Sequence, residues 1–419
     1  MEHIKTKYLI LGAGLTGLTF AAHKQEHEYI LIEKEKTYGG YCGTHIKNDF
    51  VWDYSGHFFH FKTQAVKQMF LDAIPSEDVV EVRKNTKILY NGELIDYPFQ
   101  KNIHQLPQKE FIDCLYDLYF RKTDWNSENF HEMLYAKFGK SITEKFLKPY
   151  NEKLYACELS QLDSDAMGRF FPYADIDDII KNFKTENNQY YNDTFLYPRK
   201  GAQQFIDYLY SQVEREKIYY NEDIVKIDYY NKTLYTKKRK YNYEYLISTI
   251  PLNKFAEYLE FPTDQIMSYN KVLTLNIGFH ADSTKKFSDI HWLYVPDKKY
   301  NFYRIGFYNH IVPASKLSVY VEIGFSPDKN IDISHEFKET LKNMKSIGII
   351  DSNTEVVDWE AVIMDPAYVH INKKTEKLKA ILFGEMRKNN IYSIGRYGEW
   401  KYCSMEDCII DALKLGNTI

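Results

Sequence analysis

The first sixty residues constrain the fold most strongly. A strand-like run from Tyr8 to Leu11 leads into the turn Gly12-Ala13-Gly14-Leu15-Thr16-Gly17, and a second apolar run from Tyr29 ends at Glu33. A dinucleotide-binding βαβ unit needs this order: a buried strand, a turn where backbone approaches a pyrophosphate, a helix N-terminus and an acid for a ribose. Glu33 also falls about twenty residues beyond the first glycine, as the fingerprint expects. The segment therefore predicts a dinucleotide site whose ligands are Gly12, Gly14, Gly17 and Glu33.

The residues after Glu33 indicate which dinucleotide binds, because a flavin needs contacts beyond the βαβ unit. An adjacent glycine pair, Gly39-Gly40, precedes Tyr41-Cys42-Gly43-Thr44. Such a pair often marks only a turn, but after the first motif it offers backbone that can lie against a cofactor. The pattern resembles the N-terminus of the large FAD-binding superfamily that includes amine oxidases, protoporphyrinogen oxidases and UDP-galactopyranose mutases. We therefore expect FAD as cofactor, with Gly39 and Gly40 among its ligands.

Composition argues against several other classes of function. The net charge of −4 over 419 residues does not indicate the basic surface that binds nucleic acid. No apolar run reaches the roughly 18 residues that span a bilayer. The length suggests roughly two to three domains. The five cysteines are odd in number and form no CxxC pair, so we expect no metal site and a reduced, cytoplasmic setting.

Arginine is scarce in this chain, with nine among the 54 basic residues, whereas tyrosine reaches 37. Three of the few arginines, Arg199, Arg304 and Arg396, lie in motif-like segments. A planar, permanently charged guanidinium suits phosphate recognition. These three arginines are therefore candidates for binding phosphate groups.

The pattern of residues divides the chain into three regions. Helical spacing predicts mainly helix from Pro107 to about Tyr155, and period-two alternation between Lys271 and Ile323 predicts antiparallel strands. Strands Tyr245–Ile250 and Ile391–Ile394, the latter followed by a helix from about Met405, resemble those that complete the flavin domain in the superfamily. The expected fold class is α/β: a discontinuous Rossmann-type FAD-binding domain (1-80, 195-262 and 371-419), a mainly helical subdomain (97-190) and an antiparallel-sheet substrate domain (263-370).

Five separated segments narrow the resemblance, and together they span nearly the whole chain. They are Asp53-Tyr54-Ser55-Gly56-His57, Tyr97-Pro98-Phe99-Gln100-Lys101-Asn102, Pro149-Tyr150-Asn151-Glu152-Lys153-Leu154, Trp292-Leu293-Tyr294 with Phe302-Tyr303-Arg304, and Gly395-Arg396-Tyr397-Gly398-Glu399-Trp400-Lys401-Tyr402. They look like segments of UDP-galactopyranose mutases, especially the eukaryotic-type branch. That family interconverts the pyranose and furanose rings of a nucleotide-linked galactose without net electron use, because reduced flavin acts as a nucleophile at the anomeric carbon.

The resemblance implies roles for particular residues. Arg304, Tyr294, Tyr368 and Tyr402 match residues that contact the substrate diphosphate, although a single tyrosine is more often half-buried in a core. Gly56 and His57 match a loop beside the flavin, and we assign His57 no acid or base role. Arg396 matches an arginine that serves the flavin or its phosphates. The residues that match the nucleotide and diphosphate pocket are Tyr97, Phe99, Gln100, Asn192 and Trp292.

Two departures from the family pattern leave the particular sugar and reaction open. Lys148 stands where the family has an arginine before Pro-Tyr-Asn, so a point charge replaces a bidentate fork at this expected substrate contact. After Tyr402 the chain reads Cys403-Ser404-Met405-Glu406-Asp407 in place of the family's amide-and-histidine ending.

Three functions remain in competition on these residues. The first is a redox-neutral nucleotide-sugar mutase that works with reduced FAD. It would need an external reductant such as NAD(P)H and would take part in polysaccharide biosynthesis. The second is an FAD-dependent oxidase or desaturase of the protoporphyrinogen oxidase or amine oxidase type, which needs an apolar or aromatic-caged pocket. The third is a flavin-binding protein without turnover. The base-and-diphosphate residues favour the first, and the sequence does not predict an oligomeric state.

Overall fold

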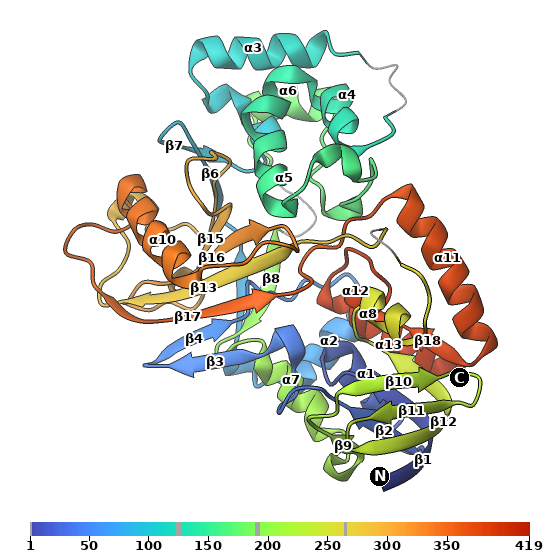
Figure 1. The fold of residues 1–419 in the computed structure, drawn as a ribbon. Helices are drawn as coiled ribbons and strands as arrows, with labels where there is room; N and C mark the ends of the chain where they lie inside the picture. Colours follow the sequence, from blue (N-terminus) through green and yellow to red (C-terminus); the bar gives the residue numbers. More distant parts are fainter. Residues whose placement is uncertain (1, 123–126, 189–192, 264–265) are drawn as a thin grey trace.

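The computed structural model describes residues 2–122, 127–188, 193–263 and 266–419. Within them the chain forms two large sheets and a lobe of helices (Figure 1). This arrangement confirms the α/β class expected from the sequence. One predicted site residue, Asn192, lies outside the described residues.

The first sheet contains the predicted βαβ unit. Its central strand β1 (Glu2–Leu11) pairs in parallel with β2 (Tyr29–Ile32) on one side and with β12 (Arg239–Ser248) on the other. The described strands follow the order β10-β11-β12-β1-β2-β9, and β18 (Ile391–Ser393) pairs in parallel with β12. The remaining strands are β9 (Ile218–Tyr219), β10 (Ile224–Asp228) and β11 (Thr233–Thr236). The start, the middle and the end of the chain therefore meet in one sheet.

Helices cover both faces of this sheet because β1 is apolar on both. Tyr8 and Ile10 pack into a core with α1 (Leu15–His23), α7 (Gln203–Ser211) and α13 (Met405–Thr418). Leu9 and Leu11 pack into a second core with α8 (Leu252–Tyr258) and α11 (Lys373–Lys388). Such a continuous apolar run is typical of a strand buried between two helical layers.

The second sheet has the strand order β17-β13-β16-β15-β14-β6-β7 among the described residues. All neighbouring pairs are antiparallel except β14 with β6, which is parallel. Two of its strands come from residues 86–96, earlier in the chain than the antiparallel region expected from the sequence. The strands are β6 (Thr86–Tyr90), β7 (Glu93–Asp96), β13 (Lys271–Phe279), β14 (Trp292–Tyr294), β15 (Arg304–Phe307), β16 (Ser318–Phe325) and β17 (Val356–Met364).

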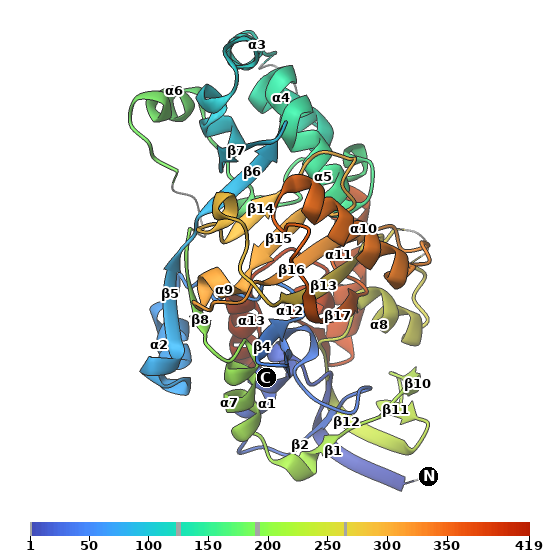
Figure 2. The ribbon, with the colours of Figure 1, turned by 90° about the vertical axis from the view of Figure 1, so that its left-hand side faces the viewer.

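The helical lobe stands at the end of this sheet where β6 and β7 lie (Figure 2). It consists of α3 (Gln108–Tyr119), α4 (Phe130–Ile142), α5 (Lys148–Tyr155) and α6 (Ile176–Lys184), with a π-helical turn Thr143–Leu147 between α4 and α5. These helices share one hydrophobic core with Ile88 and Ile95 of the sheet. The lobe is therefore packed onto β6 and β7, and β6 pairs directly with β14.

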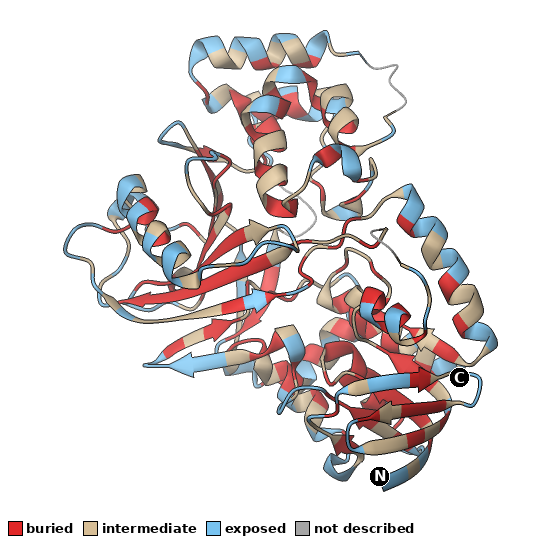
Figure 3. Cartoon of the chain, in the orientation of Figure 1, coloured by how far each residue is buried: buried red, intermediate tan, exposed pale blue. Residues whose placement is uncertain are grey.

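The remaining elements lie outside the two large sheets and the helical lobe. They are the hairpin β3 (Thr44–Lys47) and β4 (Phe50–Asp53), the pair β5 (Val79–Arg83) and β8 (Thr194–Pro198), and the helices α2 (Gln64–Ala73), α9 (Tyr308–Ile311), α10 (Ile333–Ile347) and α12 (Gly395–Gly398). Buried residues form continuous bands through both sheets, while the outer helix faces are exposed (Figure 3). In the described part of the chain, every helix is too short or too polar to cross a bilayer.

Candidate active site

The glycine turn after β1 has the geometry of a dinucleotide cradle. Gly12 has a φ of +100°, which favours glycine, and its N–H donates to the Ile32 carbonyl at 2.9 Å. A Cβ on Gly17 would overlap the Gly12 carbonyl oxygen, whereas a Cβ on Gly14 would have no heavy atom within 4 Å. Gly14 caps α1 without any side-chain hydrogen bond. The turn therefore leaves open space in front of the α1 N-terminus, where a pyrophosphate fits.

The second glycine pair and Glu33 complete the cradle. Gly39 donates its N–H to the Ala13 carbonyl at 2.9 Å and forms a β-bridge with Gly14. The two carboxylate oxygens of Glu33 accept the N–H groups of Ala13 at 2.7 Å and Glu35 at 2.9 Å. These contacts bring both glycine segments and the ribose acid together at the carboxyl ends of β1 and β2. The residues therefore fit the adenosine and pyrophosphate parts of FAD.

Arg396 approaches the same region from the C-terminal part of the chain. Its Nη1 donates to the Cys403 carbonyl at 2.7 Å, and its guanidinium lies 4.8 Å from the centre of the Tyr402 ring and 5.5 Å from that of Tyr368. Gly395, with a φ of +80°, packs so closely on Thr16 of α1 that a Cβ would clash with the Thr16 side chain. Arg396 therefore connects the α1 N-terminus to the predicted substrate tyrosines.

His57 lies in the loop after β4, where the backbone carbonyl of Ser55 holds it in place. The imidazole Nδ1 is 3.2 Å from the Ser55 carbonyl, and the His57 N–H donates to the same carbonyl at 2.8 Å. Burial lowers the pKa of His57 to about 4, so the ring is neutral at pH 7. A Cβ on Gly56 would overlap Tyr320 and Phe58. Glycine is therefore needed for this loop to pack against β16.

Arg304 lies in a row of polar residues that crosses three strands of the second sheet. Strand register places it opposite Tyr294 of β14 on one side and opposite Glu322 of β16 on the other. Its Nε and Nη2 donate to the two Glu322 carboxylate oxygens at 2.6 and 2.7 Å. The Ser55 hydroxyl donates to Glu322 as well. The row therefore joins the predicted diphosphate arginine to the loop that carries His57.

Glu322 is ionised despite its position. Its side chain is only 1% exposed, and burial alone raises the pKa of a carboxyl group. The charge and hydrogen bonds of Arg304, together with that of Ser55, outweigh burial and hold the Glu322 pKa below its usual value. A buried ion pair with a bidentate geometry results.

Tyrosines surround this ion pair. Arg304 Nη2 lies 3.5 Å from the Tyr368 hydroxyl, and the Tyr368 ring stacks on Tyr402 with centres 5.7 Å apart. The Tyr294 ring packs on Tyr150 of α5 at 5.0 Å and edge-on against Tyr97 at 5.1 Å. Four tyrosines expected from the sequence, Tyr97, Tyr294, Tyr368 and Tyr402, thus gather around Arg304 and Arg396.

The other residues predicted to contact substrate do not lie beside Arg304 in the same way as the tyrosines. Phe99 is fully buried between Tyr90 and Phe146, and Trp292 is 4% exposed with its N–H donated to Tyr320. Gln100 is buried and donates to the Pro172 carbonyl, while its amide oxygen has no hydrogen-bond partner among the described residues. Lys148 lies 3.9 Å from Glu152, one turn further along α5. Phe99 and Trp292 therefore serve as core in this structure, whereas the Gln100 oxygen is available as an acceptor.

Sequence reasoning did not select Glu322 or Lys84. The Lys84 ammonium lies 5.0 Å above the Trp292 ring, and the Arg304 charge acts on it electrostatically. Each belongs to an ordinary run of residues, Tyr-Val-Glu-Ile and Arg-Lys-Asn, so no local signal distinguishes them. Alternation in β16 places Glu322 and Tyr320 on one face, which is the only sequence feature that could have suggested the glutamate.

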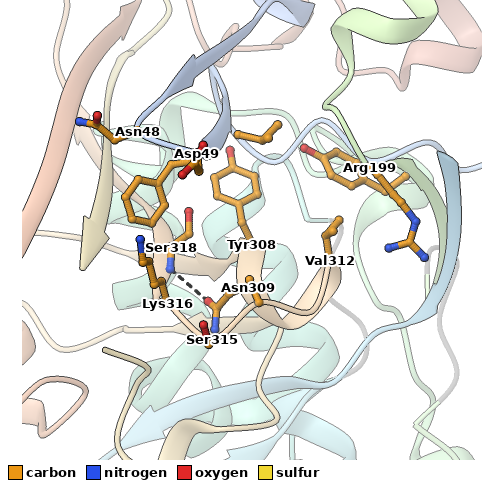
Figure 4. A pocket seen from close by; sticks show the side chains of 13 residues that line it. Asn48, Asp49, Arg199, Tyr308, Asn309, Val312, Ser315, Lys316 and Ser318 are labelled. Carbon is orange, nitrogen blue, oxygen red and sulfur yellow. Dashed lines mark hydrogen bonds between the residues drawn. The ribbon is translucent and has the colours of Figure 1, made fainter. Parts of the chain in front are cut away.

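A cavity of about 270 Å³ opens elsewhere, between the β3–β4 turn and α9 (Figure 4). Tyr197, Arg199, Tyr308 and residues of the β3–β4 hairpin are part of its wall. Arg199, considered above as a phosphate ligand, donates its Nε to the Glu77 carbonyl at 2.9 Å. Neither Arg304 nor any residue of the glycine cradle lines this cavity, so it is separate from both of them.

The fold, the cradle and the buried polar row define an FAD-dependent enzyme with a Rossmann-type domain. The chain belongs to the family described as flavin containing amine oxidoreductase, whose model matches residues 15–413. The cofactor is FAD.

Solved structures with similar folds come from several enzyme types. A reduced UDP-galactopyranose mutase is 24% identical, with 98% of this chain and 95% of that chain covered and a TM-score of 0.92. A protein from Exiguobacterium sp. 255-15, described provisionally as a protoporphyrinogen oxidase, is 17% identical over 99% of this chain and 98% of its own, with a TM-score of 0.77. Cyclohexylamine oxidase from Brevibacterium oxydans is 11% identical, with coverages of 99% and 98% and a TM-score of 0.73. The fold is therefore shared by mutases and oxidases.

Proposed function

We propose that this chain is a redox-neutral nucleotide-sugar mutase that works with reduced FAD and interconverts the pyranose and furanose forms of an NDP-hexose similar to UDP-galactose. The observation that carries the proposal is the row of Tyr294, Arg304 and the buried Glu322, joined through Ser55 to the His57 loop. A fixed guanidinium ringed by tyrosine hydroxyls suits a diphosphate leaving group. The likeness to a reduced UDP-galactopyranose mutase supports the same activity.

Each residue of the row has a distinct part in this proposal. Glu322 occupies Nε and one N–H of Nη2, so Arg304 keeps its remaining N–H groups in one orientation for the diphosphate. The hydroxyls of Tyr368 and Tyr402 donate to the same phosphate oxygens as charge develops on them. Reduced FAD, when bound, supplies the nucleophile for the anomeric carbon. His57 remains neutral and contributes its position beside the cofactor.

The proposal is tested with dithionite-reduced holoprotein and a panel of nucleotide sugars. Chromatography is expected to show a second ring form of one sugar, with the flavin still reduced afterwards. Oxidised holoprotein is the control and is expected to give no product. Consumption of one equivalent of oxidant for each product molecule would contradict a redox-neutral reaction.

An oxidase or desaturase is the second candidate, because the family is named for amine oxidoreductases and oxidases share the fold. This activity calls for an apolar or aromatic-caged pocket, flavin reduction by the substrate itself and oxygen uptake. The buried ion pair at Arg304 argues against it, since a charged row is costly to maintain where no charged substrate binds. An oxygen electrode with amine substrates separates the two activities.

The mutase proposal also implies a compartment, a reductant and a pathway for the protein. Turnover in the cytoplasm needs an external reductant such as NAD(P)H, and a furanose product suits polysaccharide biosynthesis. Anaerobic mixing of holoprotein with NADH or NADPH measures flavin reduction directly. Failure of both nucleotides to reduce the flavin would remove them as the reductant.

A further inference from the structure

Two cysteines meet at the start of the last helix. The Sγ atoms of Cys403 and Cys408 are 3.7 Å apart, and both residues are 7% exposed. Ser404 caps α13, so Cys403 occupies the position before the cap and Cys408 the fourth helical position. Side chains at these two positions meet in a hydrophobic staple. The contact between the two thiols therefore follows from their positions on either side of the helix N-cap.

A capping box fixes this geometry. The Asp407 carboxylate accepts the N–H and the hydroxyl of Ser404, both at 2.8 Å, and the Ser404 hydroxyl accepts the Asp407 N–H at 3.3 Å. Arg169 of the helical lobe donates to the same carboxylate at 2.6 Å. The backbone on both sides of the thiol pair is thus held, so closure to a disulfide has to come from rotation about the χ1 angles of the two cysteines. A disulfide of ordinary length needs the sulfurs to close to about 2.05 Å.

The two thiols differ in chemistry. The contact between the two sulfurs lowers the pKa of Cys408 and raises that of Cys403, so the Cys408 thiol loses its proton more readily. Its place in the first turn of α13 adds the positive end of the helix dipole. A third cysteine, Cys42, lies in the same sulfur cluster, with its Sγ 3.8 Å from the Met405 Sδ. Cys42 is therefore a matched comparison: a buried thiol, 9% exposed, whose sulfur contacts a thioether.

The thiol pair is connected to the active site by its backbone. The carbonyl of Cys403 accepts the hydrogen bond from Arg396 Nη1 at 2.7 Å, and Arg396 lies against the rings of Tyr402 and Tyr368. Tyr402 is the residue directly before Cys403. Any shift of the Cys403 peptide therefore reaches Arg396 and Tyr402 together.

We propose that Cys403 and Cys408 are a reversible oxidation site, in which a peroxide joins the two sulfurs as a disulfide and thereby shifts Arg396 and Tyr402. The Cys408 thiolate attacks a peroxide oxygen, which breaks the O–O bond, releases water or an alcohol and leaves a sulfenic acid. The Cys403 sulfur then attacks the Cys408 sulfur, and water leaves. In total two thiols and one peroxide give a disulfide, a water and a second water or alcohol. A dithiol reductant reverses the change.

The experiment uses purified holoprotein that is reduced with dithiothreitol, freed of it and treated with hydrogen peroxide. The intact mass is expected to fall by two hydrogen atoms, and peptide mapping to join the segments that carry Cys403 and Cys408. The flavin absorbance spectrum is expected to change with oxidation and to return with dithiothreitol. The Cys42→Ser variant is expected to behave like the natural protein in both respects.

Single variants separate oxidation from a purely structural staple. Cys403→Ser is expected to form no disulfide and to let a sulfenic acid on Cys408 be trapped with dimedone, at unchanged FAD content. If the natural protein keeps its mass under peroxide, the pair is only a hydrophobic staple and the proposal fails. A disulfide that involves Cys42, or one that leaves the flavin spectrum unchanged, would equally overturn it. None of these readouts depends on mutase activity.

Discussion

Arg304 and Glu322 face each other on adjacent strands and form a bidentate ion pair with N···O distances of 2.6 and 2.7 Å. The glutamate is 1% exposed and the arginine 19%, so the pair is largely removed from water. The two formal charges cancel locally. Arg304 is therefore a rigid donor of hydrogen bonds, and further positive charge for a diphosphate has to come from its neighbours.

This pairing predicts how stability responds to substitution. Arg304→Ala leaves the Glu322 carboxylate buried without a partner, which is expected to cost about 3–5 kcal/mol in the free energy of unfolding. Arg304→Met combined with Glu322→Gln removes both charges and is expected to recover most of that loss. Urea denaturation of the three proteins measures the effect. A double variant no more stable than Arg304→Ala would show that the pair is not coupled.

Arg304→Lys is the better test of substrate binding, since it keeps a positive charge opposite Glu322 but loses the fork. Charge-assisted hydrogen bonds contribute about 1.5–3 kcal/mol, so catalytic efficiency on the nucleotide sugar is expected to fall roughly ten- to a hundredfold. FAD content, measured from the absorbance of released flavin, is expected to stay the same. Normal turnover or loss of flavin would remove Arg304 from the diphosphate site.

Two glycines of the cradle separate cofactor binding from folding. A side chain on Gly14 meets open space, so Gly14→Val is expected to fold but to lose FAD, because the side chain fills the place of the pyrophosphate. A Cβ on Gly17 overlaps the Gly12 carbonyl, so Gly17→Ala is expected to lower the stability of the apoprotein too. Circular dichroism and flavin content distinguish the two outcomes. Retention of FAD by Gly14→Val would place the pyrophosphate elsewhere.

The cradle could be predicted from sequence because its signals are local. Gly12, Gly17 and Glu33 stand at fixed spacings, and the structure shows a backbone reason for each of them. The same holds for the closing helix α13, which begins at Met405 as its pattern indicates. Short-range rules such as turn geometry and burial of a strand determine these features.

The partners of Arg304 could not be predicted, because they depend on strand register over long distances. Glu322 and Tyr294 meet Arg304 only once β14, β15 and β16 are aligned, and a shift by one residue would turn them to the other face. Lys84 directly follows a separate strand, β5, which ends at Arg83. Conversely, Trp292 matched a family motif but is buried beneath that lysine. Motifs indicate which residues take part, whereas packing decides which of them face the substrate.

Lys84 is a second positive charge that interacts with Arg304. Burial, together with the Arg304 charge, lowers the pKa of Lys84 to about 7. Lys84 is therefore protonated below pH 7 and loses its charge as the pH rises through 7. A bound diphosphate favours the protonated form, so UDP affinity is expected to fall above pH 7, by up to about tenfold per pH unit.

Isothermal titration of oxidised holoprotein with UDP between about pH 7 and 9 measures this dependence. Lys84→Arg keeps its charge throughout and is expected to bind UDP equally well across the range, whereas Lys84→Met is expected to bind weakly at every pH. Lys148→Ala is the matched comparison, because Lys148 pairs with Glu152 on α5 and is expected to leave the pH profile unchanged. A flat profile in the natural protein would exclude Lys84 from the site.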